Sequence, residues 1–204
     1  PQFISNNYRE GRKVFSSIEN ELLSCEEFSI SVAFITMGGI TPLLQTLREL
    51  ECRGIPGRIL TTDYLAFSDP KALRILANFK NIELKMFVTE NAKEGFHTKG
   101  YIFKKKEIYR MIVGSSNMTL SALTKNREWN TKIVSTDQGE YAQNLVSEFE
   151  QLWNAEESLS FEQFIESYTK LYTKNKLIKK QRETARQEEI PSLEMYRLQP
   201  NSMQ

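Results

Sequence analysis

Apolar and polar positions follow two different periods along most of this chain. Runs that alternate, or that become continuously apolar, predict strands, whereas apolar residues that recur every three or four positions predict helices. The predicted helices cover residues 8–24, 40–52, 70–79, 118–125 and 139–153, and the predicted strands cover 28–36, 57–62, 82–88, 97–103, 107–113 and 128–135.

The order of these elements predicts the fold class. Helices and strands alternate at first, which requires crossover connections between parallel strands. The runs 97–103 and 107–113 follow each other directly, with Lys104–Lys106 between them, and this arrangement predicts an antiparallel hairpin. A chain with both kinds of connection is expected to form an α/β fold with a mixed β-sheet flanked by helices.

The composition changes after the last of these helices, and we expect three segments. Residues 1–155 form the main domain. Residues 156–190 form a helical linker or extension outside its core, in which 161–187 predict one long helix or two. Residues 191–204 form an extended tail that starts at Pro191, because proline interrupts regular helix.

Charge and hydropathy exclude several classes of protein. The chain has 27 basic and 26 acidic residues, a net charge of +1, which argues against a polybasic binder but allows a local basic face. Seven basic residues fall between positions 170 and 186, a pattern more typical of a solvated helix than of a nucleic-acid arm. The chain has no run of 18 apolar residues and no apolar signal core, so we expect a cytoplasmic protein without membrane contact. It does not begin with Met, so we expect a fragment or a processed chain.

The supply of metal ligands is small. The chain has one histidine, His97, and two cysteines, Cys25 and Cys52, which are far apart in sequence. A zinc site draws on two or three imidazoles or on a set of thiolates, so we expect no metal. A mechanism that needs two histidines must therefore take the second from another copy of the chain.

Several polar residues fall at one end of the predicted hairpin. His97 and Lys99 are two residues apart on a strand and therefore point to one face. The hairpin turn lies at the opposite end, so His97 meets the turn-like segment 114–117, and Glu128 at the start of the next strand reaches the same end. Each feature alone has a plainer interpretation, since a lone histidine is more often structural and Gly-Ser-Ser-Asn is typical of a turn. We also expect Trp129 to pack and not to stack on a base.

Together these groups suit phosphoryl transfer. The imidazole of His97 can attack phosphorus or protonate a leaving oxygen. Lys99 and Asn117 can hold the nonbridging oxygens, and Glu128 can orient the imidazole by accepting its other N–H. The turn supplies N–H groups for an anion nest. The expected phosphate-binding residues are Gly114, Ser115 and Ser116.

The pattern resembles the active-site signature of the phospholipase D superfamily, and it is closest to the nuclease branch that includes phospholipase D-like restriction endonucleases. In that branch a lysine, an asparagine and a glutamate follow the histidine at +2, +20 and +31. Lys99, Asn117 and Glu128 stand at these offsets from His97. The broader family often has an aspartate five residues after the lysine, where this chain has Lys104; the later acid is its usual counterpart in the nuclease branch.

The resemblance implies a mechanism and an assembly. Two such motifs build one site, in which one histidine forms a phosphohistidine and the other protonates the leaving oxygen, without a metal. One motif per chain implies a homodimer through the active-site face. The implied partner is DNA.

The end of the chain carries a second resemblance. Residues 198–204, LQPNSMQ, look like the Q-motif that opens the motor domain of DEAD/DEAH-type helicases, in which Gln204 would bind adenine. This implies that a helicase motor, using ATP and magnesium, follows in the full-length protein. The leading hypothesis is thus an endonuclease module of a helicase-linked restriction or defence protein. The alternatives are a non-catalytic nucleic-acid-binding or dimerisation module of a helicase, and a lipid phosphodiesterase.

Overall fold

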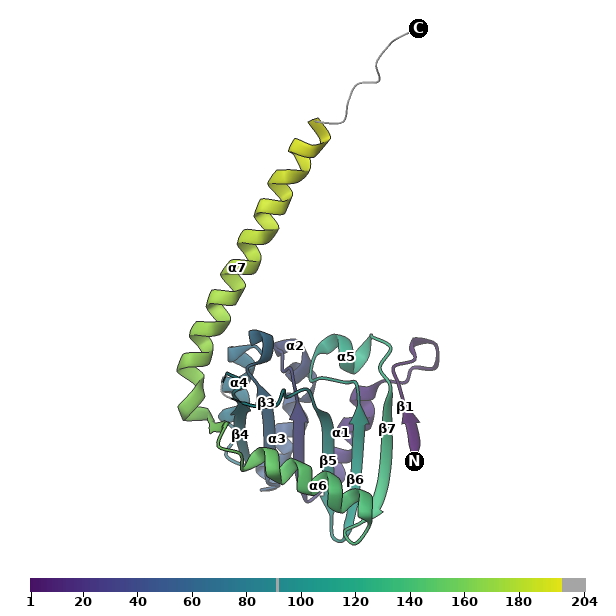
Figure 1. The fold of residues 1–204 in the computed structure, drawn as a ribbon. Coiled ribbons are helices and arrows are strands. Elements are labelled where there is room, and N and C mark those ends of the chain that lie inside the picture. Colours follow the sequence, from purple (N-terminus) through teal and green to yellow (C-terminus); the bar gives the residue numbers. More distant parts are fainter. Residues whose placement is uncertain (91, 196–204) are drawn as a thin grey trace.

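The computed structural model describes residues 1–90 and 92–195, which form a single eight-stranded sheet with helices on both faces (Figure 1). The strands are β1 (Gln2–Ile4), β2 (Glu27–Val32), β3 (Gly57–Thr62), β4 (Ile82–Phe87), β5 (Lys99–Lys105), β6 (Ile108–Gly114), β7 (Asn130–Thr136) and β8 (Ser158–Ser160). The α-helices are α1 (Val14–Ser24), α2 (Met37–Ile40), α3 (Leu44–Cys52), α4 (Pro70–Ala77), α5 (Leu120–Thr124), α6 (Glu140–Trp153) and α7 (Phe161–Met195). Three 3-10 turns are η1 (Tyr8–Glu10), η2 (Thr41–Leu43) and η3 (Tyr64–Ala66).

The sheet is mixed, as the sequence predicts. Its order is β1-β7-β6-β5-β2-β3-β4-β8; β2, β3 and β4 run parallel, and all other neighbours pair antiparallel. One consequence is that the ends of β2, β3, β4 and β6 meet the starts of β5 and β7 at a single edge. We call this the site edge; it lies beneath α2 and α5 in Figure 1.

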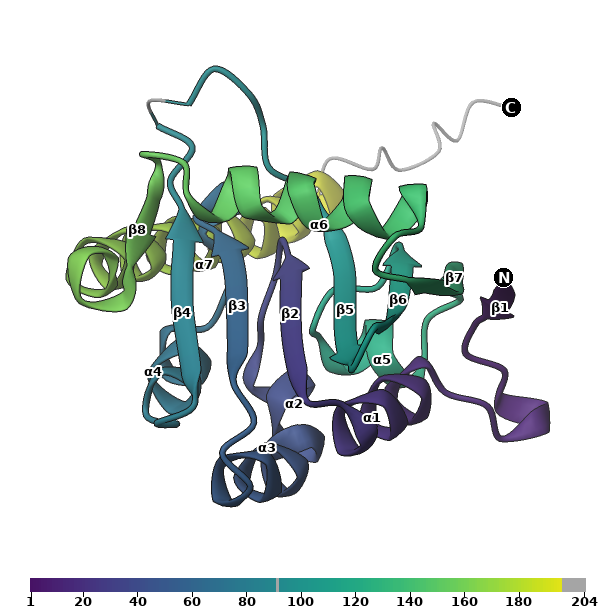
Figure 2. The same ribbon diagram turned by 90° about the horizontal axis from the view of Figure 1, so that it is seen from below.

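Helices cover the two faces of the sheet unequally (Figure 2). Helix α6 alone covers one face, where Phe149 and Trp153 stack at 5.6 Å between ring centroids and pack with buried residues of β3, β5 and β6. Helices α1, α3 and α4 cover the other face and bury a larger apolar cluster. Both faces of the central strands are therefore covered, whereas β7 keeps exposed side chains such as Val134.

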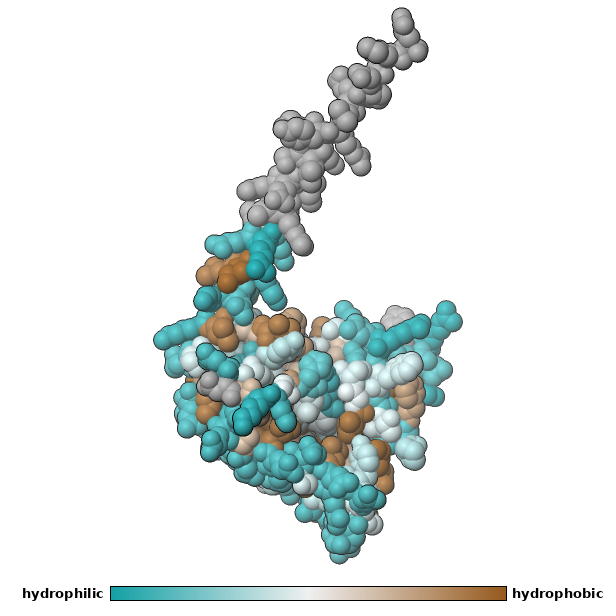
Figure 3. All heavy atoms as spheres, viewed as in Figure 1, coloured by the Kyte–Doolittle hydropathy of each residue, from teal (hydrophilic) through white to brown (hydrophobic). Residues whose placement is uncertain are grey.

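The last helix belongs partly to the core. Strand β8 pairs with β4, and Phe164, Ile165 and Tyr168 of α7 are buried in the larger cluster. The packed core therefore extends past the predicted boundary at residue 155. The rest of α7 projects from the body (Figure 1), and hydrophobic residues gather where the helix leaves it (Figure 3). None of the described helices is long and apolar enough to span a membrane.

The predicted tail begins later than expected. Helix α7 is one helix and continues through Pro191 to Met195, so the prediction of extended structure from residue 191 is wrong for its first residues. Proline removes one helical N–H donor, and here the neighbouring residues continue the helix. Gln204 and residues 196–203 lie outside the described residues.

Two predicted helices are interrupted. The run 8–24 divides into η1 and α1 because Gly11 takes a left-handed φ of 66° between them. The run 40–52 divides into α2, η2 and α3. Gly39 lies inside α2, where a Cβ atom would lie 2.0 Å from the Met118 carbonyl oxygen, so this glycine permits a close backbone approach.

Two strand boundaries also differ from the predictions. The strand expected over residues 28–36 ends at Val32, because the chain then bends to pair with the segment after β6. The hairpin turn expected at Lys104–Lys106 is shorter, since β5 continues through Lys105 and Lys106 alone takes a positive φ of 52°. The hairpin itself is confirmed, with Gly100 opposite Val113.

Candidate active site

His97 and Lys99 meet at the start of β5. Lys99 is the first residue of β5, opposite Val32 of β2, and its Nζ lies 2.7 Å from His97 Nδ1 and donates to the His97 carbonyl at 2.9 Å. Thr98 points the other way and bonds Ser31. The shared face of His97 and Lys99 is therefore confirmed, although His97 itself precedes the strand.

Burial and charge act in opposite directions on Lys99. Partial burial lowers the pKa of its ammonium group, and the Coulombic attraction of Glu128 raises it by a smaller amount. The net pKa is below the ordinary value. His97 is exposed, so its imidazole is accessible to a substrate.

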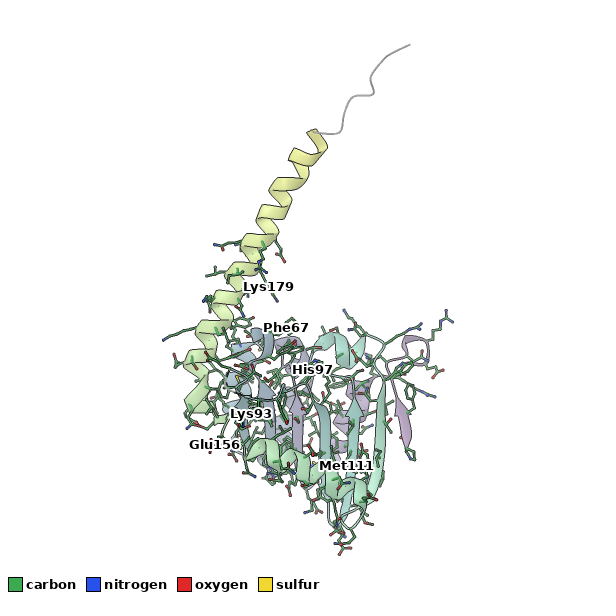
Figure 4. The ribbon with its side chains drawn as sticks, in the orientation of Figure 1. Phe67, Lys93, His97, Met111, Glu156 and Lys179 are labelled. Atoms are coloured by element: carbon green, nitrogen blue, oxygen red, sulfur yellow. The ribbon has the colours of Figure 1, made fainter. Side chains whose placement is uncertain are left out.

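Aromatic rings surround the imidazole on one side. The rings of Phe34 and Tyr64 both lie edge-on to His97, with centroids at 6.2 Å, and Phe67 lies 4.9 Å from Phe34. Figure 4 shows Phe67 between His97 and Lys179 of α7, whose Nζ lies 5.6 Å from the Phe67 ring centroid. Sequence reasoning missed these aromatics; the signal was an aromatic residue in each segment that follows β2 and β3.

Asn117 is fixed by the backbone that follows β2. Its Oδ1 accepts the N–H of Phe34 at 3.1 Å, which leaves the NH2 group of the carboxamide to donate to a substrate oxygen. The next residue, Met118, donates its N–H to the Phe34 carbonyl at 3.0 Å and accepts from Thr36 N–H at 3.1 Å. Phe34 therefore joins Asn117 through its backbone and His97 through its ring.

The two serines of the turn have different environments. Ser116 is fully buried; its N–H donates to Asn130 Oδ1 at 3.3 Å, and its Oγ accepts from Asn130 Nδ2 at 2.9 Å. Tyr101 donates its hydroxyl to the Ser116 carbonyl at 3.0 Å. The polar groups of Ser116 already have buried protein partners, so its hydrogen bonds give no support to the predicted phosphate contact.

Ser115 is exposed, but its polar groups also have hydrogen-bond partners within the protein. Its N–H donates to the Trp129 carbonyl at 3.1 Å, and its Oγ accepts from Trp129 N–H at 3.1 Å and donates to Glu128 Oε2. Gly114 pairs with Asn130 as the last residue of β6. The expected anion nest is therefore not formed, since the N–H groups of Ser115 and Ser116 are both satisfied within the protein.

Glu128 lies at the same edge but does not orient the imidazole of its own chain. Within the described part of the chain its hydrogen bond is with Ser115, and none joins it to His97. The expected Glu128–His97 bond is therefore absent from the single chain. Glu128 is electrostatically coupled to Lys99 and also to Tyr101, whose pKa is raised mainly by burial and secondarily by this carboxylate.

Asn130 and Tyr101 are the structural residues of the site that sequence reasoning missed. Both sit within strands, where a buried carboxamide cannot be distinguished from a solvent-facing one by alternation alone. No group of three His, Cys, Asp or Glu side chains within residues 1–90 and 92–195 is placed to hold a metal ion.

The site edge therefore gathers His97 and Lys99 from the start of β5, Asn117 from the segment after β6 and Glu128 from the segment before β7. This fold and constellation define a phospholipase D-like domain, of a phosphodiesterase superfamily. The chain belongs to the family described as "Cardiolipin synthase, PLD-like domain", whose match covers residues 19–153. No curated protein matches the chain.

Solved structures share the fold at low sequence identity. NucT from Helicobacter pylori is 19% identical, with a TM-score of 0.60 over 78% of this chain and 98% of that one. Nuc from Salmonella typhimurium, a phospholipase D family member, is 17% identical, with a TM-score of 0.59 over 78% and 97%. Phosphatidylserine synthase from Haemophilus influenzae is 14% identical, with a TM-score of 0.58 over 90% of this chain and 46% of that one.

Proposed function

We propose that this chain is a metal-independent endonuclease that cleaves DNA through a phosphohistidine in a dimeric active site. The observation that carries the proposal is the accessible imidazole of His97, with the Lys99 ammonium group 2.7 Å from its Nδ1. The match of nearly the whole length of two compact Nuc-type structures supports a nuclease more than a lipid enzyme.

In the proposed first step a neutral imidazole nitrogen of His97 attacks phosphorus, and the bond from phosphorus to the leaving oxygen breaks. Lys99 and Asn117 stabilise the charge on the nonbridging oxygens. The partner's His97 donates its proton to the leaving oxygen and then takes one from water. That water cleaves the phosphorus–nitrogen bond, which releases a phosphomonoester and restores the first imidazole.

The proposed dimer follows from the count of histidines. The chain has one imidazole, and this reaction uses two, so the second chain must face the first across the site edge. In the proposed dimer, Glu128, which bonds Ser115 within its own chain, would accept a hydrogen bond from the partner's imidazole.

We further propose that the domain serves as the nuclease module of a helicase-linked restriction or defence protein. The support is the sequence LQPNSMQ that ends in Gln204. A nuclease carried by a motor gains repeated access to one DNA molecule, because tethering raises the effective concentration of the substrate.

The first test is cleavage of labelled single-stranded and duplex DNA in EDTA. We expect activity in the chelator and its loss by at least about a thousand-fold in His97→Ala. Because His97 is exposed, the free energy of unfolding should stay within about 0.5 kcal/mol of the wild type. Binding without turnover by the intact protein would support the non-catalytic alternative, and release of choline from phosphatidylcholine would support a lipid enzyme.

The dimer has its own test. After subunit exchange, an equal mixture of wild-type and His97→Ala chains should retain about one quarter of the wild-type activity, because one dimer in four carries both imidazoles. Retention of half the activity, or a monomer in sedimentation at the assay concentration, would contradict a shared site.

A further inference from the structure

A groove lies between the segment that follows β1 and the segment that follows α5, and its lining includes Arg127 and Trp129 on either side of Glu128 in the sequence. Its volume is about 650 Å³. We call it the basic groove, and its lining residues are Ser5, Asn6, Asn7, Arg9, Lys125, Arg127 and Trp129.

The charge of this groove is of one sign. Three of its side chains are cationic and no carboxylate lines it. Within the described residues, none of Arg9, Lys125 and Arg127 forms a salt bridge, whereas the nearby Glu10 is paired with Arg12 at 3.1 Å. Uncompensated cations in a concave surface attract phosphates and make binding depend on salt.

Trp129 is exposed in this groove, which overturns the expectation that it packs. Trp129 is 74% exposed, and its indole lies edge-on to the ring of Phe3, at 6.2 Å between ring centroids. Its backbone is nevertheless fixed, because its N–H and carbonyl both bond Ser115. An indole held in place with its ring in water is suited to stack on an unpaired base.

The groove is also preformed. Asn6 donates to the carbonyls of Ala122 at 2.8 Å and Asn126 at 2.7 Å, and its Oδ1 accepts the Val14 N–H. This side chain joins the N-terminal segment to the segment that carries Lys125 and Arg127. The cations therefore flank the indole before any ligand arrives, which lowers the cost of binding.

We propose that the basic groove binds a single strand of nucleic acid, with phosphates on Arg9, Lys125 and Arg127 and one base stacked on Trp129. This rests on the proposed function, because the strand then leads past Glu128 to the phosphodiester held by Lys99. In a duplex the faces of the bases are already stacked, so Trp129 favours unpaired substrate.

Tryptophan fluorescence tests the proposal directly. The chain has two tryptophans, and the other one, Trp153, is buried on α6 and serves as an internal reference. In a His97→Ala background, which keeps the strand uncut, a 12-nucleotide single-stranded DNA should quench the emission. Trp129→Phe should remove that quenching but retain most of the affinity, and Trp129→Ala should weaken binding by about 5- to 100-fold.

The cations are tested by the salt dependence of the same titration. Lys125→Ala with Arg127→Ala should reduce the slope of log affinity against log salt by about 1.4, or 0.7 for each lost phosphate contact. Lys80→Ala is the matched control, because Lys80 is exposed just before β4 and thus at the opposite edge of the sheet. Its slope should be unchanged.

Three outcomes overturn the proposal. The first is quenching that persists in Trp129→Phe. The second is equal quenching by a duplex of the same sequence. The third is quenching that appears when the protein concentration rises in the absence of DNA. The last would assign the groove to a second copy of the chain. If single-stranded DNA binds in a Trp129-dependent way but the wild-type protein does not cleave it, the endonuclease proposal fails and the proposal for the basic groove stands. If the protein cleaves DNA equally well with and without Trp129, the endonuclease proposal stands and the proposal for the basic groove fails.

Discussion

Two segments at the site edge contribute to one site but are held very differently. In the turn from Gly114 to Asn117, Ser116 and Asn117 are hydrogen-bonded to Asn130, Tyr101 and Phe34, and Ser115 is hydrogen-bonded to Glu128 and Trp129. The segment 97–99 is open, since His97 is exposed and its contacts are with Lys99 and with ring edges. The comparison indicates that the hydrogen-bonded turn provides a fixed reference position for the site. The imidazole of His97, in contrast, is left accessible to a substrate or to a second chain.

The strongest test of that comparison removes the anchor of the rigid segment. Asn130→Ala deletes two hydrogen bonds to Ser116 and leaves buried polar groups unpaired, so the free energy of unfolding should fall by about 2–3 kcal/mol. Activity should fall as well, because Asn117 is carried on the same turn. Urea unfolding and single-turnover cleavage measure the two effects, and Asn20→Ala, on the exposed face of α1, is the control. A stable Asn130→Ala protein with full activity would show that the turn is not the reference.

A smaller effect separates the neighbouring serines. Ser116→Ala should cost about 1–2 kcal/mol of stability, since its buried hydroxyl bonds Asn130. Ser115→Ala should change stability by less than about 0.5 kcal/mol but reduce cleavage about ten-fold, because its exposed hydroxyl holds Glu128. The same pair of assays applies. If the two variants exchange their effects, the division between structural and chemical residues is wrong.

The smallest effect concerns the electrostatic link between the two segments. Burial lowers the pKa of Lys99, and its ammonium form is the one that binds phosphate, so affinity persists below that pKa and is lost as the pH rises through it. The loss should therefore begin at lower pH than for an ordinary lysine of pKa 10.5. Glu128→Gln removes a charge that supports the ammonium form and should move the loss to still lower pH. Lys99→Arg should move it upward.

Inhibition of cleavage by inorganic phosphate as a function of pH provides that measurement. Lys80→Arg, at the opposite edge, is the matched control and should leave the profile unchanged. If phosphate inhibition is lost over the same alkaline pH range in the wild type, Lys99→Arg and Glu128→Gln, then a group other than Lys99 titrates there.

The sequence predicted the meeting of His97 with the segment 114–117 because a hairpin is local. Once β5 and β6 pair antiparallel, the ends of both strands must coincide, whatever the rest of the chain does. The mixed sheet followed for a similar reason, since the order of elements limits how strands can connect. The short strands β1 and β8 carry too few residues to show a period, and both were missed.

Roles that depend on distant partners were not predictable in the same way. Whether Ser116 faces water or Asn130 depends on how β6 and β7 pair, and Glu128 bonds Ser115 for the same reason. The aromatic neighbours of His97 come from segments that follow β2 and β3, which are remote in sequence and adjacent only in the folded sheet.

The attachment of α7 has a mechanical consequence. Tyr168 donates its hydroxyl to the Ser68 carbonyl at 2.7 Å, and the Ser68 hydroxyl accepts the N–H of Ile35 at 3.0 Å. Ile35 directly follows Phe34, the residue that contacts both Asn117 and His97. The buried base of α7 is therefore joined to the segment that carries Phe34 by two hydrogen bonds through one serine, so the position of the projecting helix and the position of the reacting groups share one attachment.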